Sequence, residues 1–250
     1  MRSGSPELII FLAASLTAAN PLHAISTLSL DAFATTSEGW QIGGAGVQPT
    51  WNGGTGQDGA SGFLIHFSDA GGANGKWLMR SSLSEWLGNY TAAGVTGITL
   101  WADNAAGSPL GLRIAFDGPG GWFYSAPQTI TNSTGGADWT PLTFNLAPVN
   151  FTHATGSGGT ADFASTMGNV TRFEIFGGAG PVIFRGGGDL VEAGTSSNTV
   201  RVDNISAIPE PSALALGIAG FALAATTRRR HPTPSRGFTC KLPGKLLWKQ

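Results

Sequence analysis

Aromatic residues beside polar ones are the part of this sequence best suited to chemistry. Trp101 lies in GITLWADN, where apolar and polar residues alternate, and it falls on the polar side. Trp122 and Tyr124 alternate in GGWFYS, while Arg113 and Asn145 hold polar positions in nearby segments. A flat aromatic ring can cover the face of a sugar while polar groups bind its hydroxyls, so these five residues are expected to form a saccharide site. The alternative is that the rings fill a core, since Trp is mostly buried.

Motifs for catalysis or cofactor binding are weak. GTGQDG at Gly54–Gly59 matches the G-x-G-x-x-G fingerprint, but the strand before it and the helix after it are missing. The same stretch begins like a calcium-binding β-roll repeat in one copy, so a loop is the simpler interpretation. His66 and His153 lack metal-ligand spacing, and no G-x-S-x-G is present. Two carboxylates could still converge as in glycosidases, although the spacing identifies no pair.

Length and charge limit the class of protein. The chain has 250 residues with a net charge of -1 and 38 glycines, enough for one sizeable domain with many turns. Thirteen acidic and six basic residues lie between Ile25 and Ile208, whereas seven basic and no acidic residues follow from Arg228. An acidic body argues against nucleic acid as a partner, because phosphate binding requires clustered Lys and Arg. The one cysteine, Cys240, lies outside this body, which therefore has no disulfide.

Short strands are predicted for the body. Ile98, Leu100 and Ala102 alternate with polar residues, and the same period of two recurs in LGLRIAFDG, PLTFNLAPV, VTRFEIFGG, GPVIFRGG and NTVRVDNISAI. Gly, Pro and Asn separate these segments, and no convincing amphipathic helix is found. We therefore predict an all-β fold for residues 25–208, an antiparallel β-sandwich of jelly-roll type.

Both ends of the chain carry membrane signals. Residues 1–24 combine Arg2, a short apolar run and a small residue at Ala24, which predicts a secretory signal peptide. Residues 213–227 contain no charge and predict a marginal transmembrane helix. Arg228, Arg229 and Arg230 follow directly and place the C-terminus in the cytoplasm by the positive-inside rule. The body is then expected on the far side of the membrane, in agreement with the signal peptide.

The tripeptide Pro209, Glu210 and Pro211 stands just before that apolar run. Together with the run and the three arginines it resembles the PEP-CTERM sorting signal of Gram-negative bacteria, over residues 209–230. The resemblance implies recognition by an exosortase-type enzyme, transient anchoring in the inner membrane, and release to the cell surface or extracellular matrix. The basic tail at 231–250 departs from that family, whose signal ends within a few residues of the arginines.

The order of landmarks in the body carries a second resemblance. LSLDAFATTSEGWQIGG near the start, LGLRIAFDGPGGWFYSAP in the middle and VRVDNISAIPEP at the end are similar to the sandwich ectodomains of PEP-CTERM proteins, which resemble carbohydrate-binding modules and laminin-B-type domains. Such modules often hold a structural calcium between the first and last strands. The resemblance therefore implies a calcium site at Asp31 and Asp203, whose hard oxygen ligands suit that ion. The alternative is two solvated carboxylates.

The function expected from the sequence is that of an exported, non-catalytic surface or matrix protein that binds polysaccharide. A glycan-active hydrolase or lyase and a purely structural envelope protein are the alternatives. An exposed aromatic face would favour the first, and a carboxylate pair in a cleft would favour the enzyme.

Overall fold

The computed structural model describes residues 25–42, 48–59, 62–68, 77–81, 83–133, 138–178, 180–185, 188–192 and 197–210. The predicted signal peptide, Pro211, the apolar run at 213–227 and the three arginines lie outside these ranges. Within them, no helix is long and apolar enough to cross a membrane.

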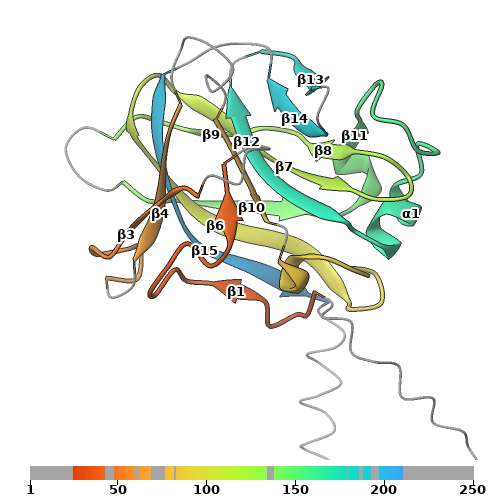
Figure 1. Cartoon of the computed structure of the whole chain (residues 1–250), viewed down its shortest axis with the longest axis horizontal. Helices are drawn as coiled ribbons and strands as arrows, with labels where there is room; N and C mark the ends of the chain where they lie inside the picture. Colours follow the sequence, from red (N-terminus) through yellow and green to blue (C-terminus); the bar gives the residue numbers. More distant parts are fainter. Residues whose placement is uncertain are drawn as a thin grey trace, which may run out of the picture. The chain divides into compact units, whose positions relative to one another are not determined.

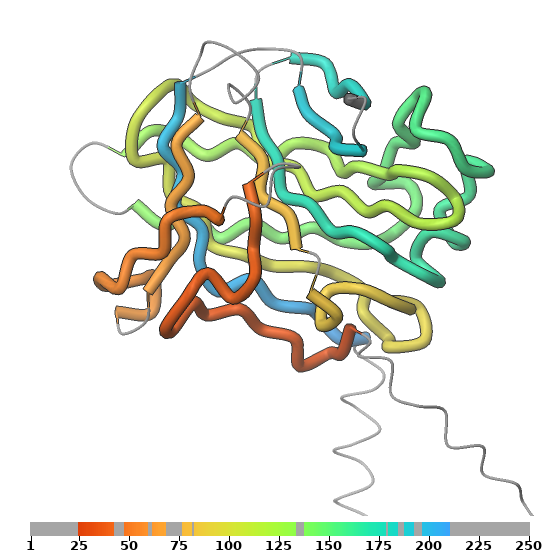
Figure 2. The backbone as a smooth tube through the Cα atoms, viewed as in Figure 1, coloured from red at the N-terminus to blue at the C-terminus, as the bar shows by residue number. Residues whose placement is uncertain are grey.

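One sheet is built around the long strands β6 (Val95–Ala106) and β15 (Asn198–Pro209) (Figure 1). Its order is β10 (Thr140–Asn145), β6, β15, β4 (Phe63–Ser68) and β3 (Thr50–Asn52). The short β1 (Leu30–Asp31) also pairs with β15, so the first and last strands are neighbours (Figure 2). This is the first sheet.

The second sheet has β7 (Leu110–Asp117) and β12 (Arg172–Gly178) at its centre. Its order is β11 (Phe151–His153), β8 (Phe123–Ser125), β7, β12, β5 (Trp77–Ser81) and β2 (Trp40–Gln41), and β9 (Gln128–Ile130) also pairs with β7. A separate hairpin joins β13 (Val182–Arg185) to β14 (Asp189–Glu192). All these strand pairs are antiparallel, as predicted for a jelly-roll β-sandwich.

The core lies between the two sheets and follows the alternation in the sequence. Ile98, Leu100 and Ala102 of β6 face Leu112 and Ile114 of β7 across this core, and all five are fully buried. β-Branched and aromatic side chains pack well on the buried side of a pleated sheet, while the polar residues between them face outward. The predicted faces of these strands are therefore confirmed.

Helices are short in the described part of the chain. Two 3-10 turns, η2 (Ser84–Trp86) and η3 (Pro148–Asn150), accompany α1 (Phe163–Gly168), which the sequence pattern did not indicate. The Asp162 side chain accepts the Ala164 N–H at 3.1 Å and caps α1, whose six residues are too few for a visible period. A Cβ at Gly120 would lie 1.9 Å from the Asp162 carbonyl, so the chain there approaches α1 too closely for another residue.

Both described ends of the domain attach to the segment between η2 and β6. The Ile25 N–H donates to the Leu87 carbonyl at 2.8 Å, and the Glu210 N–H donates to the Gly94 carbonyl at 2.8 Å. The chain therefore enters and leaves the sandwich at neighbouring places. Pro209 ends β15, in the extended backbone expected of it, and the exposed Glu210 follows.

Candidate functional site

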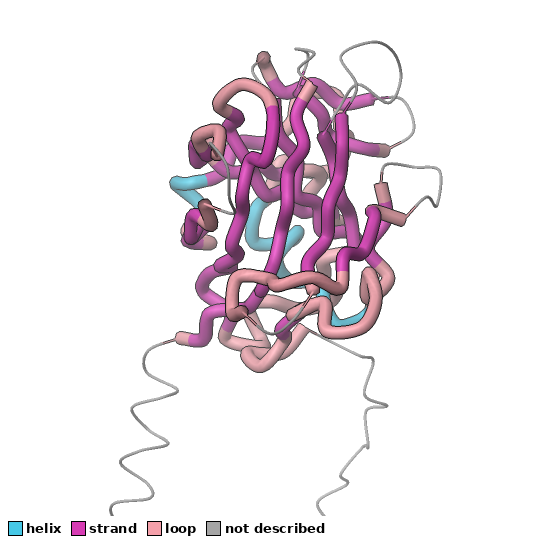
Figure 3. Tube along the Cα trace, turned by 90° about the vertical axis from the view of Figure 1, so that its left-hand side faces the viewer, coloured by secondary structure: helices cyan, strands magenta, loops and turns pink. Residues whose placement is uncertain are grey.

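The outer side of the first sheet carries aromatic and polar side chains together; we name it the first-sheet face. Figure 3 views the molecule from the side where β3 and β4 lie in Figure 1, and shows long strands running side by side. Because the core residues of these strands alternate with outward ones, the face includes Phe63, Ile65, Phe67, Thr99, Trp101, Asp103, Pro141, Thr143, Asn145, Thr199, Arg201 and Asp203.

Trp101 occupies the middle of this face. It pairs across the sheet with Pro141 on one side and Asp203 on the other, and its side chain is half-buried. Part of the indole therefore remains open to solvent on a sheet surface. An amphipathic ring held in this way presents a large contact area at low conformational-entropy cost.

An ion pair between β6 and β15 lies next to Trp101. Arg201 Nη1 lies 3.1 Å from Asp103 Oδ2, and the Asp103 side chain has no exposed surface while that of Arg201 is 27% exposed. Arg201 also lies over the Phe63 ring at 5.6 Å, a cation–π geometry. The guanidinium thus joins a buried carboxylate to an aromatic ring on one polar surface.

The segment before β10 lies across the same face. The Asp138 N–H donates to Asp103 Oδ1 at 3.3 Å, and the half-buried Trp139 ring meets Phe63 edge-on at 5.7 Å. Trp139, Asp103 and Arg201 were not among the predicted site residues. The sequence gives only a weak indication of Asp103 and Arg201, which hold polar positions in segments where apolar and polar residues alternate.

The predicted saccharide residues do not share one face. Trp101 and Asn145 belong to the first sheet, whereas Arg113, Trp122 and Tyr124 lie with the second. Trp101 and Asn145 lie on neighbouring strands, but Arg113 does not, and the expected five-residue saccharide site is therefore not formed. Alternation separates outward residues from inward ones, but both sheets of a sandwich have an outward side.

The β13–β14 hairpin covers the outer side of the second sheet. Leu190 and Val191 of the hairpin pack with Leu78, Phe176 and Trp122, which form an apolar cluster separate from the main core. Trp122 is only 2% exposed, as the core interpretation required. Arg113 and Tyr124 are half-buried beside it, with the guanidinium 5.7 Å from the Tyr124 ring. We name this region the covered face.

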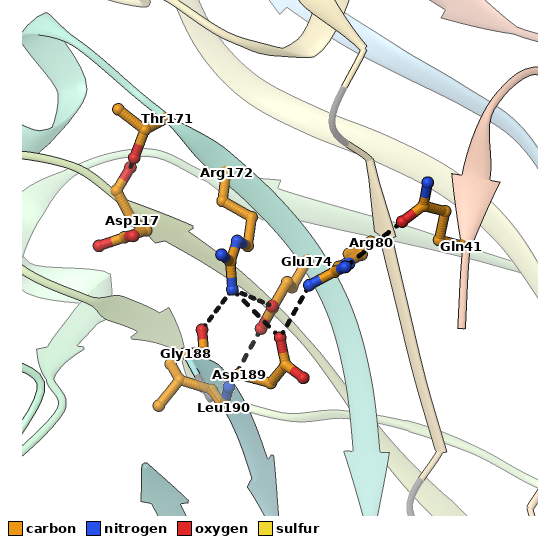
Figure 4. Close-up of polar contacts among 9 residues, drawn as sticks. All are labelled: Gln41, Arg80, Asp117, Thr171, Arg172, Glu174, Gly188, Asp189 and Leu190. Carbon is orange, nitrogen blue, oxygen red and sulfur yellow. Dashed lines mark hydrogen bonds and ion pairs between the residues drawn. The ribbon is translucent and has the colours of Figure 1, made fainter. Parts of the chain in front are cut away.

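Charged residues fasten the hairpin to the strands beneath it (Figure 4). Asp189 Oδ1 accepts from Arg80 Nη1 at 3.2 Å and from Arg172 Nη1 at 3.1 Å. Glu192 Oε1, at the end of β14, accepts from Arg113 Nε at 2.8 Å. Since these arginines come from β5, β12 and β7, the hairpin is joined to three strands of the second sheet.

Glu174 lies at the centre of the covered face and has no exposed surface. Its Oε2 accepts the Leu190 N–H at 3.2 Å, while its Oε1 lies 3.9 Å from Arg172 Nη1. Burial, and next the charge of nearby Asp189, raise the pKa of Glu174 well above its ordinary value. Glu174 and Asp189 are thus two neighbouring carboxyl groups, a pair that the sequence spacing did not reveal.

Asp31 is buried among aromatic residues. Its Oδ2 accepts the indole N–H groups of Trp40 at 2.5 Å and Trp86 at 2.6 Å. Burial raises the pKa of Asp31 to about 7, although the two indole donors oppose this shift. Asp31 is therefore a core carboxyl group with specific partners, unlike the solvated carboxylate considered as an alternative.

Asp203 sits at a register shift in β15, where Asn204 has a positive φ of 49°. Its carboxylate accepts the Gln57 N–H at 2.7 Å and the Asn204 N–H at 2.8 Å. Burial is the largest cause that raises its pKa to about 6. Gln57 belongs to the GTGQDG stretch, so this loop serves to cover Asp203.

The pairing of Asp31 with Ile205 brings the two aspartates onto adjacent strands, as expected. Carboxylate oxygens are suitable calcium ligands, and the charge of Glu38 raises the pKa of both aspartates. However, the described residues contain no group of three or more His, Cys, Asp or Glu that could hold a metal ion. Two carboxylates that accept N–H groups do not by themselves fill calcium's shell of six to eight oxygens, and calcium here stays a prediction.

A surface cleft of about 230 Å³ lies beside Asn145. Its polar lining includes Gln128, Thr143 and Asn150, from the edges of both sheets. Asn145 Oδ1 accepts the Ala147 N–H at 2.8 Å, and its carbonyl accepts from Asn150 Nδ2 at 3.1 Å. Asn145 thus stabilises the turn after β10.

Comparison with known proteins gives a limited result. No protein-family model matches the chain, and no curated protein matches it. Among solved structures it is similar to a carbohydrate-binding module described as specific for non-crystalline cellulose, CBM28, at 14% identity and a TM-score of 0.44, covering 74% of this chain and 96% of that one. It is also similar to a xylan-binding CBM22 domain from Paenibacillus barcinonensis, at 14% identity and a TM-score of 0.42, covering 75% and 97%. Similarity at this level assigns no ligand to the chain.

Proposed function

We propose that this chain is an exported, non-catalytic protein that binds polysaccharide on the first-sheet face. The observation that carries the proposal is the position of Trp101. Its half-buried ring lies on the outer side of the first sheet, on the same face as Trp139 and the Arg201–Asp103 pair. A ring that is held but not enclosed can cover one face of a sugar, and the polar groups beside it can bind hydroxyls.

The hydrolase or lyase alternative receives less support. Glu174 and Asp189 are the kind of carboxyl pair that glycoside hydrolysis uses. The β13–β14 hairpin lies over them, however, and Glu174 has no exposed surface. The arginines Arg80 and Arg172 also hold Asp189 in ion pairs that join the hairpin to the sheet. A role in fastening the hairpin accounts for this pair more directly than a role in catalysis.

The proposed location rests on the two ends of the chain. The signal peptide at 1–24 directs export, and the PEP-CTERM-like signal at 209–230 is read by an exosortase-type enzyme of a Gram-negative bacterium. The protein is then anchored transiently in the inner membrane and passes to the cell surface or extracellular matrix. The exposed position of Glu210, directly after the last strand, supports its recognition at the surface of the sandwich.

The test is a comparison of two aromatic substitutions in the body at residues 25–208. Trp101→Ala should lower the affinity for the bound polysaccharide at least about tenfold, a loss of about 1.4 kcal/mol. The matched control is Tyr124→Ala, which removes a half-buried ring from the covered face and should leave binding unchanged. Affinity gel electrophoresis measures binding, and circular dichroism checks the fold of each variant.

Two outcomes contradict the proposal. Loss of binding in Tyr124→Ala but not in Trp101→Ala would move the site to the covered face. Absence of retardation by every polysaccharide in a broad glycan panel would leave the structural envelope protein as the better interpretation.

A further inference from the structure

The charges on the first-sheet face bear on the chemistry of its ligand, given the proposed function. Arg201 is the basic residue that the described strands place on this face. Asp103 and Asp203 lie on the same strands, Asp138 stands beside Asp103, and the charge of Asp58 acts on Asp203. The acidic groups therefore outnumber the basic one at this surface.

Arg201 already has a carboxylate partner within the protein, and its side chain is 27% exposed. Its Nη1 is paired with Asp103 Oδ2 at 3.1 Å, and the Asp103 side chain is fully buried. The Nε of Arg201 is itself buried. A sugar carboxylate that competed for the guanidinium would leave Asp103 in the interior without its counter-ion, which is costly because a buried charge needs a partner.

The remaining acidic groups repel anions. Asp138 and Asp58 are exposed, so their fields reach a ligand that approaches the face within a Debye length, about 10 Å at 0.1 M salt. Like charges brought together at an interface suppress the wrong partner. An uncharged sugar meets neither penalty, and it can still use the Trp101 and Trp139 rings.

We infer that the ligand of the first-sheet face is an uncharged polysaccharide, and that polyuronates, sulfated glycans and other polyanions are excluded from it. This inference rests on the proposed function. It makes a prediction that the aromatic platform alone does not, since ring stacking is equally available to neutral and acidic sugars.

Affinity electrophoresis of the body in gels that contain neutral polymers (β-glucan, xylan, galactomannan) or acidic ones (polygalacturonate, alginate) tests the inference. At least one neutral polymer should bind at least about tenfold more tightly than either acidic one, and its affinity should be the same at about 20 mM and about 200 mM salt. The variant Asp58→Lys/Asp138→Lys should bind polygalacturonate several-fold more tightly at low salt and keep its affinity for the neutral polymer.

The possible failures are distinguishable. Binding of an acidic polymer as tight as that of any neutral one, lost in Trp101→Ala, would overturn the inference and leave the proposed function standing. No binding of any polymer would overturn both. An affinity for polygalacturonate that is unchanged in the double lysine variant would show that the acidic groups do not select the ligand, and would also overturn the inference.

Discussion

Arg172 on β12 and Asp189 on the β13–β14 hairpin form an ion pair of 3.1 Å that joins the hairpin to the second sheet. Asp189 shares the same oxygen with Arg80. The carboxylate is thus a common anchor for two strands and the hairpin above them. Because both arginines keep only part of their surface in water, this anchor is stronger than an ordinary surface pair.

Replacing Asp189 with Asn should therefore destabilise the body by about 1–3 kcal/mol, because Arg80 and Arg172 each lose an ion pair with this carboxylate. Urea unfolding followed by tryptophan fluorescence measures the change. The matched control, Asp138→Asn, alters an exposed carboxylate and should stay within about 0.5 kcal/mol of the parent. Equal effects in the two variants would show that the hairpin anchor contributes no special stability.

The buried Glu174 should make the free energy of unfolding depend on pH. Its pKa is raised in the folded state, so the folded protein holds its proton over a range in which the unfolded chain has released it. This contribution is fully present below the unfolded value of 4.5 and is lost as pH rises through the folded pKa. Stability should fall as pH rises from about 4.5, and Glu174→Gln, which cannot ionise, should make that fall less steep.

Thermal unfolding of both proteins from acidic to mildly alkaline pH checks this prediction. The charged groups around Glu174 are Arg80 on β5, Asp117 on β7, Arg172 on β12 and Asp189 on β14, and they are the same in both proteins. Parallel profiles for parent and variant would contradict a proton held by Glu174.

The buried Asp31 carboxyl group is favoured in its protonated form without a metal and in its ionised form with bound calcium. Without an ion, the folded pKa of about 7 means that Asp31 adds stability below pH 3.8 that is lost as pH rises toward 7. A calcium ion bound near Asp31 and Asp203 would favour the ionised form and stabilise the native state by mass action. Adding calcium to the chelated body at neutral pH should therefore raise its melting temperature, and Asp203→Ala should abolish the rise. An unchanged midpoint at millimolar calcium removes the metal proposal.

The sorting signal predicts a specific effect of Glu210. Glu210→Ala keeps the backbone hydrogen bond to Gly94, so the sandwich should fold as before. If a processing enzyme reads the tripeptide, the variant should persist as an uncut, membrane-bound precursor. Intact mass of the protein from membrane and surface fractions of the native host measures this, with Asp138→Ala as a control that is processed normally. A surface protein that still ends at Gln250 would falsify processing.

The sequence by itself determined the strand faces and the class of fold. Alternation in GITLWAD placed Leu100 inward and Trp101 outward, and the structure agrees, because successive side chains of any strand point to opposite sides. The resemblance to sandwich modules also implied that the first and last strands are neighbours, which the pairing of Asp31 with Ile205 confirms. The direction of a side chain depends on its own strand alone, and the adjacency of the first and last strands is common to many sandwich folds.

Only the tertiary structure decided which outward residues meet. Arg113 and Trp101 both point away from the core, yet they lie on opposite sides of the sandwich, because each sheet has its own outer surface. Glu174 holds a polar position in RFEIFGG and would be exposed on an open sheet, but the β13–β14 hairpin covers it. Local pattern specifies a strand and its two faces; what packs on the outer face depends on segments distant in sequence, whose docking leaves no periodic signal.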